Sequence, residues 1–478
     1  MLRLRLLLII FVLAVGSTAS AQPGGPTITL LHFNDVYEIT PIEAGNAGGL
    51  ARVATLRARL KARYPRLLTT LGGDFLSPSA IGTAQVGGEP LAGRQMVAVL
   101  NVLGLDWATL GNHEFDVGER AFRARLAEAR FGIVVSNVTD ANGARFEKTV
   151  PHAILPIKTP SGTIRVGLIG LTIAANLQPW VRYTPPVEAA RAAVAALKGK
   201  TDAIVALTHL TLAGDRQVAE QVPGIDVILG GHEHENWLLE RGPRFTPIVK
   251  ADANVRTVAV VSLRFAKKGA RPAVTARLER IDRRLPEGRR TSAEVRKWTG
   301  IAYYGFRKDG FDPAAVVATI ASPLDGRESS VRNGPTPLTA LITEAMRREA
   351  GTAIAVFNGG SIRIDDVLPP GPVTQYDVIR VLPFGGRIVK ATFTGALLDR
   401  VLKVGAANAG TGGYLHAVGV PSPIDPVARY TLAISDFLLT GAEENLGFLT
   451  RNNPEITDVS ELRDVRLAVI DELRRTPR

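Results

Sequence analysis

The short segment GNHEFD, residues 111–116, brings together an amide, an imidazole and a carboxylate. These groups belong to Asn112, His113 and Asp116, which follow the apolar run 107–110, an expected β-strand. Oxygen and nitrogen ligands of mixed hardness at a strand end are typical of metal-dependent hydrolytic sites. A single loop of this kind is weak evidence, because many loops carry Asn, His and Asp. Its weight depends on whether other strand ends carry similar groups.

Several other expected strand ends do carry such groups. They are Asp35 in FNDVY, Asp74 in GGDF, His209 in LTHL, and His232 with His234 in GGHEH. Because the last two are two residues apart on extended chain, both imidazoles point to one side and can reach different ions of a close pair. A shared carboxylate such as Asp74 reduces the repulsion between two dications about 4 Å apart. Each residue alone has a structural explanation, as a satisfied polar group, a turn former or a helix cap, but the series favours a dinuclear metal centre.

The hydrophobic pattern predicts the elements that must position these groups. The first half is expected to alternate strands and helices, which favours βαβ units with polar groups at the carboxyl ends of strands. The expected strands are 27–33, 67–71, 107–110, 132–135, 165–170, 203–207 and 227–229, and the expected helices are 48–63, 96–103, 121–129, 187–197 and 216–221.

A polar helix at residues 292–307 is expected to connect this half to a second domain. The second pattern begins near residue 311 and is α+β. Its expected strands are 316–321, 353–357, 378–383, 390–393 and 430–435, and its expected helices are 337–350 and 395–404.

Length and composition agree with two folded domains. The 478 residues are too many for one ordinary core. Basic residues exceed acidic ones by 12, which either steers anionic substrates or reflects solvated Arg-rich helix faces. No aromatic-interleaved basic patch argues for a nucleic acid polymer as partner. The chain has no Cys, so a metal centre must use His, Asp, Asn and similar ligands.

Residues 1–21 have the organisation of a secretory signal peptide. An apolar run with two arginines ends in Ala19-Ser20-Ala21, which predicts cleavage after Ala21. The alternative is an uncleaved membrane anchor, for which the run is short. No later segment is long and apolar enough to span a bilayer. The mature protein is therefore expected to be periplasmic or secreted, without stable membrane insertion, and its oligomeric state is open.

The series FNDVY, GGDFLSPS, GNHEFD, SNV, LTHL and GGHEH resembles the motifs of the secreted, two-domain 5′-nucleotidases and UDP-sugar hydrolases. The resemblance covers nearly the whole mature chain. It implies an α/β metallophosphoesterase sandwich of the calcineurin-like class at residues 27–290 and a connector helix at 291–309. It also implies an α+β 5′-nucleotidase C-terminal domain, which binds substrate, at 310–478.

The same resemblance implies two divalent metal ions, with Zn, Mn and Co as candidates. One ion would be held by Asp35, Asp74 and His234, and the other by Asp74, Asn112, His209 and His232. His113, oriented by Asp116, would stabilise the transition state or protonate the leaving oxygen. Two such cations would activate a water for in-line attack on phosphorus.

The first motif departs from the family, which usually has Asp-x-His where this chain has Asp35-Val36-Tyr37. A neutral phenol is a weaker ligand than imidazole, so the first ion could be bound loosely or completed by water. Tyr37 acting as a phenolate ligand and Glu38 turning inward are two further alternatives. His32 is expected to face the other side of the strand and to be structural.

Substrate contacts are expected from the second domain. By resemblance, Asn358, Gly360 and Arg363 of the NGGSIR turn contact substrate, and Arg332 matches a further family arginine, although Arg327 is nearby. Guanidinium groups suit a terminal phosphate. Phe384 and Phe437 match the two aromatic residues that sandwich the nucleobase, and the structural alternative is two core phenylalanines beside strands. Glu443 lies where the family usually reads GGDG and this chain reads GAEEN, which puts a role of Glu443 in recognition in doubt.

The sequence therefore predicts a phosphomonoesterase that cleaves nucleoside 5′-monophosphates to nucleoside and phosphate. Hydrolysis of UDP-sugars, of 2′,3′-cyclic nucleotides or of a thiosulfate-type ester is an enzymatic alternative. The non-enzymatic alternative is a nucleotide-binding protein with impaired catalysis, motivated by Tyr37 and the Glu443 loop. Because the metal and stacking residues lie on different domains, a domain rotation is also expected.

Overall fold

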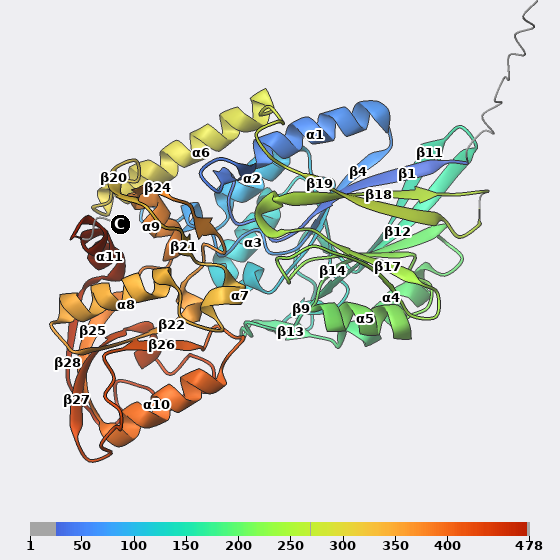
Figure 1. Cartoon of the computed structure of the whole chain (residues 1–478). Helices are drawn as coiled ribbons and strands as arrows, with labels where there is room; N and C mark the ends of the chain where they lie inside the picture. Colours follow the sequence, from blue (N-terminus) through green and yellow to red (C-terminus); the bar gives the residue numbers. More distant parts are fainter. Residues whose placement is uncertain (1–24, 268, 476–478) are drawn as a thin grey trace, which may run out of the picture.

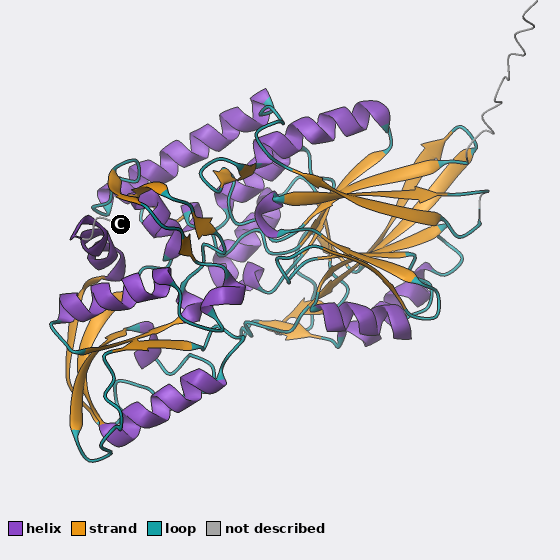
Figure 2. Ribbon diagram, in the orientation of Figure 1, coloured by secondary structure: helices purple, strands orange, loops and turns teal. Residues whose placement is uncertain are grey.

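The computed structural model describes residues 25–267 and 269–475, so the expected signal peptide lies outside the described residues. Two mixed β-sheets face each other in the N-terminal half, and the C-terminal half contains a separate five-stranded sheet (Figures 1 and 2). The chain is an α/β sandwich followed by an α+β domain, as the sequence predicted.

The first sheet has the strand order β10-β8-β7-β4-β1-β18-β19. Its strands are β1 (Thr27–Phe33), β4 (Leu67–Gly72), β7 (Trp107–Thr109), β8 (Gly132–Val134), β10 (Thr149–Val150), β18 (Thr257–Arg264) and β19 (Ala273–Arg280). From β1 to β10 neighbouring strands pair in parallel, and β18 and β19 add an antiparallel edge beside β1. The parallel arrangement places the carboxyl ends of β1, β4 and β7 at one edge of the sheet.

The second sheet has the order β11-β12-β14-β15-β17-β16. Its strands are β11 (His152–Thr159), β12 (Gly162–Thr172), β14 (Ala203–His209), β15 (Val227–Gly230), β16 (Trp237–Arg241) and β17 (Thr246–Lys250). The four central strands are parallel, and β11 and β16 pair antiparallel at the two edges. The buried apolar side chains between the sheets come from both of them, for example Leu30 and Val261 from the first and Val205 and Leu229 from the second.

Helices cover the outer faces of the sandwich. They are α1 (Leu50–Arg63), α2 (Arg94–Leu103) and α3 (Glu119–Glu128) beside the first sheet, and α4 (Pro186–Leu197) and α5 (Leu212–Gln221) beside the second. In α1, Leu50, Val53, Leu56 and Leu60 recur at helical spacing and are all buried, which explains why this segment is helical and which face it packs. Within the described residues, no helix is long and apolar enough to cross a membrane.

The C-terminal sheet has the order β26-β22-β27-β25-β28. Its strands are β22 (Ile354–Asn358), β25 (Arg387–Thr394), β26 (Leu415–Val418), β27 (Arg429–Ser435) and β28 (Ile456–Asp464). The helices of this half are α7 (Glu328–Val331), α8 (Pro337–Ala350), α9 (Gln375–Val381), α10 (Gly395–Ala407) and α11 (Val465–Arg475). Successive residues of β22 belong to different apolar clusters, so α8 and α10 cover opposite faces of the sheet (Figure 1).

Short two-stranded ribbons complete the structure. They are β2 (Pro41–Ile42) with β3 (Ala47–Gly48), β5 (Gln85–Val86) with β6 (Glu89–Pro90), β9 (Val138–Asp140) with β13 (Val181–Tyr183), β20 (Val316–Ile320) with β24 (Gly371–Thr374), and β21 (Leu324–Asp325) with β23 (Val367–Leu368). The helix α6 (Arg289–Lys308) packs against α1 and α2 and runs along one side of the molecule toward the C-terminal half (Figure 1).

The prediction of a strand at residues 378–383 is wrong, because most of this segment belongs to helix α9. The side chain of Thr374 accepts a hydrogen bond from the Asp377 backbone, and the Asp377 carboxylate accepts one from the Thr374 backbone. This capping box starts the helix. A short buried apolar run such as Val378–Val381 cannot be assigned to a strand or a helix by periodicity alone.

Candidate metal centre and substrate cleft

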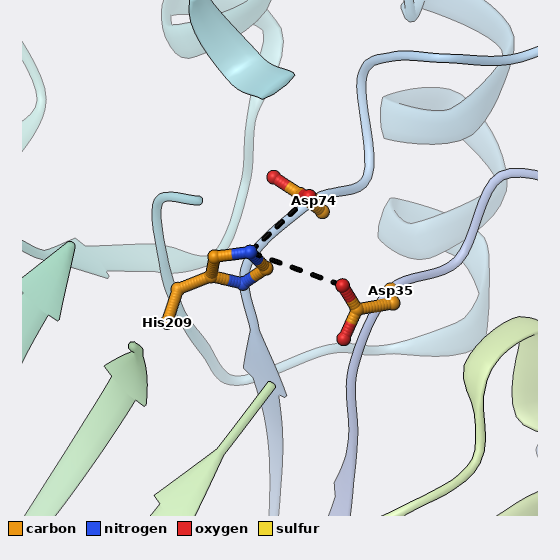
Figure 3. Close-up of side chains that lie close together, drawn as sticks. All are labelled: Asp35, Asp74 and His209. Atoms are coloured by element: carbon orange, nitrogen blue, oxygen red, sulfur yellow. Dashed lines mark ion pairs between the residues drawn. The ribbon is translucent and has the colours of Figure 1, made fainter. Parts of the chain in front are cut away.

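Asp35, Asp74 and His209 meet at the carboxyl ends of β1, β4 and β14. One ligand atom from each residue lies within 4.8 Å of the other two, and all three side chains are buried. The His209 Nε2 atom lies 3.2 Å from Asp74 Oδ2 and 3.9 Å from Asp35 Oδ1 (Figure 3). Because these strands belong to both sheets, the sandwich itself fixes the spacing of the three groups.

Each carboxylate is oriented by hydrogen bonds to one of its two oxygens. Asp35 Oδ2 accepts from Asn34 Nδ2 at 2.7 Å and from the His232 backbone at 2.9 Å. Asp74 Oδ1 accepts from the His113 backbone at 2.9 Å. In both residues the other oxygen therefore faces His209, as a metal-binding carboxylate would.

The backbone at these positions is held in an uncommon conformation. Asp35, Asp74, His232 and His234 all have φ between 51° and 88°, in the left-handed region. Such conformations cost on the order of 1–3 kcal/mol each in non-glycine residues and concentrate at functional sites. The glycine before His232 is also required, because a Cβ at Gly231 would lie 2.8 Å from Asp35 Oδ2.

Glu114 supports two of the loops from beneath. Its buried carboxylate accepts hydrogen bonds from the backbones of Asp74 at 2.9 Å and Phe75 at 2.6 Å, and it also accepts from the Gly111 backbone. Burial and the nearby charge of Asp74 raise the pKa of Glu114 to about 7, although the backbone hydrogen bonds oppose this rise. The glutamate of GNHEFD thus ties the loop that carries Asp74 to the loop that carries Asn112.

Lys250 supports the two histidine loops in a similar way. Its fully buried ammonium group donates to the carbonyls of Leu210 at 2.7 Å and Gly231 at 2.8 Å. Asp215 Oδ2, at 2.9 Å, and the Glu233 carboxylate balance its charge. The two carbonyls lie next to His209 and His232 in sequence, so one buried cation holds both loops.

The electrostatics of the site reflect its crowded carboxylates. Burial opposes charge on His209, but Asp74 and Asp35 overcome this effect and raise its pKa to about 9. Burial and the charge of His209 lower the pKa of His232 to about 3. Burial also opposes charge on Asp35 and Asp74, yet the neighbouring imidazoles hold both pKa values below the usual range. The clustered carboxylates therefore favour positive charge among them.

Two buried atoms fit a metal ion directly. Asn112 Oδ1 has no hydrogen-bond partner among residues 25–267 and 269–475, and His209 Nε2 makes no hydrogen bond there although it lies 3.2 Å from Asp74 Oδ2, whereas buried polar atoms are normally satisfied. His232 lies beside His209, with ring centroids 5.2 Å apart. Amide oxygen, imidazole nitrogen and carboxylate oxygen are the donors that Zn, Mn and Co accept, so these residues fit divalent cations.

Tyr37 points into this centre. Its hydroxyl lies 2.9 Å from His234 Nε2, 3.3 Å from Asp74 Oδ2 and 3.4 Å from Asp35 Oδ1. Burial and the charges of Asp74 and Asp35 raise the pKa of Tyr37 well above its ordinary value. Glu38 instead turns toward the C-terminal half, where it accepts a hydrogen bond from the Tyr376 hydroxyl at 2.9 Å. The alternative in which Glu38 completes the metal site is therefore wrong.

His32 lies outside the centre, as expected. Its ring contacts Thr70 Oγ1 at 3.0 Å and the Gly230 carbonyl at 3.2 Å, so both nitrogens are occupied by structural contacts.

His113 and Asp116 form a pair at the edge of the centre. His113 Nδ1 lies 2.6 Å from Asp116 Oδ2, within the single turn of 3-10 helix His113–Val117. Asn176 adds a contact that the sequence did not predict, because its Nδ2 lies 2.9 Å from His113 Nδ1 and 3.2 Å from Asp116 Oδ1. With Nδ1 engaged, Nε2 is the ring nitrogen that can meet a substrate oxygen.

A cavity of about 1060 Å³ extends from this centre to the C-terminal half. Its lining includes most of the residues that the sequence singled out: Asp74, Asn112, His113, Asp116, His232, His234, Arg332, Asn358, Gly360, Arg363, Phe384, Phe437 and Glu443. Asp35, Tyr37 and His209 lie beneath this lining and are buried. Arg451 also lines the cavity and was not predicted.

Two arginines face the cleft between the metal centre and the aromatic pair. Arg332 and Arg363 both contact Glu328, the latter at 3.4 Å between Nη1 and Oε1. Arg327, the alternative to Arg332, instead pairs with Asp325 at 2.7 Å and lines a different cavity. The cleft therefore contains Arg332 rather than Arg327.

The NGGSIR turn is tied to the Glu443 loop. Asn358 Nδ2 donates to Glu443 Oε2 at 2.7 Å, and Asn358 Oδ1 accepts from Ser361 Oγ at 2.7 Å. The backbone amide of Gly360 donates to the Gly412 carbonyl at 2.8 Å. These groups lie at the cleft wall, with their hydrogen bonds made within the protein.

Phe384 and Phe437 are not core residues. Their exposed fractions are 54% and 42%, although phenylalanine is usually buried. The Arg363 guanidinium carbon lies 5.9 Å from the centroid of the Phe384 ring. Two half-exposed rings in one cleft, with guanidinium groups nearby, suit a planar aromatic group that carries an anionic substituent.

Comparisons with known proteins agree with this arrangement. Residues 28–236 match the family model of calcineurin-like phosphoesterases, and residues 316–422 match that of the 5′-nucleotidase C-terminal domain. The chain belongs to the family of two-domain 5′-nucleotidases. Human 5′-nucleotidase is 25% identical over 460 residues, which cover 85% of this chain and 77% of that protein.

Solved structures superpose on nearly the whole chain. The 5′-nucleotidase precursor of Thermus thermophilus matches with a TM-score of 0.77 and 25% identity, covering 94% of this chain and 96% of that one. The sulfate thiohydrolase SoxB of Thermus thermophilus matches with a TM-score of 0.70 but 17% identity, which shows the fold alone. The family is that of metal-dependent phosphoric ester hydrolases, so this 5′-nucleotidase family member is an enzyme of that class.

Proposed function

We propose that the protein hydrolyses nucleoside 5′-monophosphates to nucleoside and phosphate with two divalent metal ions. The observation that carries this proposal is one continuous cleft, lined at one end by Asn112 and His113 and at the other by Phe384 and Phe437. A nucleotide matches both ends of this cleft, because it carries a phosphate at one end and an aromatic base at the other. Human and Thermus thermophilus relatives named 5′-nucleotidases support the same substrate class.

The positions of the side chains support an assignment of metal ligands. We assign Asp35, Asp74, Asn112, His209, His232 and His234 to the metals, with Tyr37 as a further contact of the first ion. When bound, two divalent cations supply the positive charge that lowers the pKa of a water and offsets the charge on the phosphoryl oxygens. Residues 27–290, the connector 291–309 and residues 310–478 are the proposed domains.

The remaining polar residues orient the substrate and move the proton. Arg332 and Arg363 present guanidinium forks to the phosphate, while Asn358, Gly360 and Glu443 shape the wall beside them. His113 donates a proton through Nε2 to the departing ester oxygen, and Asp116 keeps the proton of Nδ1 in place. Phe384 and Phe437 hold the base, which orients the ester bond relative to His113.

Other substrates remain as alternatives within the same cleft. UDP-sugars, 2′,3′-cyclic nucleotides and thiosulfate-type esters would use the same ions, and the GAEEN loop at Glu443 differs from the usual family sequence. The non-enzymatic alternative, a nucleotide-binding protein, is disfavoured because binding alone does not require the His113–Asp116 pair.

Phosphate release from a panel of substrates tests the proposal. The purified protein is assayed with nucleoside 5′-monophosphates, UDP-glucose, 2′,3′-cyclic nucleotides and a thiosulfate ester, each with Mn²⁺, Zn²⁺ or Co²⁺ and with a chelator. We expect the fastest release from 5′-monophosphates and none after chelation. His113→Ala should retain metal and lose about 10²–10⁴-fold in kcat. Equal rates with and without chelator, or no release from any nucleotide, would contradict the proposal.

We further propose export to the periplasm or the medium. The signal-like organisation of residues 1–21 supports this location. Mass spectrometry of the mature protein should find Gln22 as its first residue, and retention of Met1 in exported material would contradict cleavage after Ala21.

A further inference from the structure

A carboxylate of the C-terminal half reaches into the metal centre of the N-terminal half. Asp365 Oδ2 lies 2.8 Å from His234 Nδ1. On the opposite side of the same ring, His234 Nε2 lies 2.9 Å from the Tyr37 hydroxyl and 3.5 Å from Asp35 Oδ1. The imidazole of His234 is therefore held between Asp365 and the centre itself.

Asp365 is itself fixed by several contacts. Its other oxygen, Oδ1, accepts a hydrogen bond from the Glu328 backbone at 2.9 Å. Its carbonyl accepts one at 2.7 Å from Arg256 Nη2, which belongs to the N-terminal half. Its φ of 40° lies in the left-handed region, which a non-glycine residue occupies only when its surroundings impose it. The interface between the two halves therefore determines where this carboxylate points.

The orientation of a ligating histidine depends on the hydrogen bond at its other ring nitrogen. A carboxylate that binds Nδ1 fixes the tautomer, leaves Nε2 free of the proton and directs it to the ion. Removing such a partner typically lowers metal affinity by about 10–100-fold. Asp365 contacts Nδ1 and so meets this geometric requirement.

We propose that Asp365 is a positioning residue for the metal centre, supplied across the domain interface, which holds His234 with Nε2 directed at the first ion. This inference rests on the proposed metal-dependent function. It implies that the first ion is bound fully only when the two halves are arranged as in this structure.

The same interface links the substrate arginines to the metal centre. The backbone amide of Glu328 donates a hydrogen bond to the Asp365 carboxylate. The Glu328 carboxylate contacts both Arg332 and Arg363. Glu328 Oε2 also lies 3.8 Å from His234 Nδ1. A movement that withdraws the arginines from the cleft therefore also withdraws the partner of His234.

The test compares metal binding in Asp365→Asn and Asp365→Gly with the wild-type protein. Both replacements tolerate the left-handed backbone, so the loop keeps its conformation. Asp366→Asn is the matched control, because this neighbouring buried carboxylate contacts Arg256 and Arg380 at the same interface and makes no hydrogen bond or ion pair with His234 among the described residues. Co²⁺ is titrated into metal-free protein, and its visible absorption and the bound metal per chain are measured, with thermal unfolding recorded for each variant.

We expect two Co²⁺ per wild-type chain and an about 10–100-fold weaker affinity for one of them in Asp365→Gly, with a smaller loss in Asp365→Asn. Asp366→Asn should bind both ions within about twofold of the wild-type affinity, even if it unfolds at a lower temperature. Unchanged Co²⁺ affinities and spectra in both Asp365 variants would overturn the proposal. Wild-type protein that binds both ions but hydrolyses no nucleotide would contradict the proposed function and leave the role of Asp365 supported by the titration.

Discussion

The aromatic pair gives the sharpest test of how substrate is recognised. Phe384 and Phe437 are 54% and 42% exposed, so truncating either ring removes little buried area and should change the free energy of unfolding by less than about 1 kcal/mol. Stacking of a base on an aromatic ring is worth about 1–3 kcal/mol by alanine substitution. We therefore expect Phe437→Ala to raise KM for a nucleoside 5′-monophosphate by about 5–150-fold, since about 1.4 kcal/mol corresponds to tenfold.

The assay compares a nucleoside 5′-monophosphate with ribose 5-phosphate, which carries the same phosphate ester and no base. The Phe437→Ala and Phe384→Ala variants should leave kcat/KM for ribose 5-phosphate within about twofold of wild type. Phe393→Ala is the stability control, because this ring is fully buried in the C-terminal core and its loss should cost about 3–5 kcal/mol. An equal loss with both substrates, or unfolding as severe as that of Phe393→Ala, would refute the stacking role.

Three further substitutions probe the site and its supports. Lys250→Met should reduce the free energy of unfolding by about 3–5 kcal/mol in urea titrations, because Asp215 and Glu233 lose their buried partner, and an unchanged midpoint would contradict that role. Burial lowers the pKa of His32 to about 4 from 6.5, so the unfolded chain takes up a proton first as pH falls, and about 3 kcal/mol of stability should be lost between those values. His32→Gln should remove this part of the pH dependence, and an identical stability profile would show that other groups cause it. Asp116→Asn should lower kcat by about 10²–10⁴-fold while Co²⁺ binding is retained, whereas a parallel loss of bound metal would indicate a ligand role instead.

The sequence predicted the sandwich and the meeting of its loops because both depend on local patterns. Strands such as Thr27–Phe33 are rich in apolar and β-branched residues, and Asp35 and Asp74 lie two residues beyond the ends of β1 and β4, while His209 is the last residue of β14. Parallel strands carry their carboxyl ends to one edge, so the order of the motifs was enough to expect a cluster. Helix α9 was missed because its short apolar run has no distinguishing period.

Residues that act through contacts far apart in the sequence could not be predicted. Asp365 lies 131 residues from His234, and Asn176 lies 63 residues from His113. Neither belongs to a motif, and the residue that each contacts depends on how distant segments pack together. Glu114 lies within the GNHEFD motif, so the sequence marked its position as part of the site. Its hydrogen bonds to the Asp74 loop depend on how two strands pair and could not be predicted.

The position of Tyr37 needed the structure as well. The sequence left a phenolate ligand, an inward Glu38 and a water-completed site as alternatives. In the structure the Tyr376 hydroxyl donates a hydrogen bond to Glu38, which therefore points away from the metal centre. The Tyr37 hydroxyl lies among Asp35, Asp74 and His234. A neutral phenol in this place predicts weaker binding of the first ion than of the second.

Anomalous diffraction from crystals grown with Mn²⁺ would show whether two metal ions lie among these side chains. We expect two peaks on either side of Asp74, one within about 2.0–2.6 Å of ligand atoms from Asp35 and His234 and the other at that distance from His209 and Asn112. Metal-replete crystals with no anomalous peak in reach of these side chains would contradict this expectation.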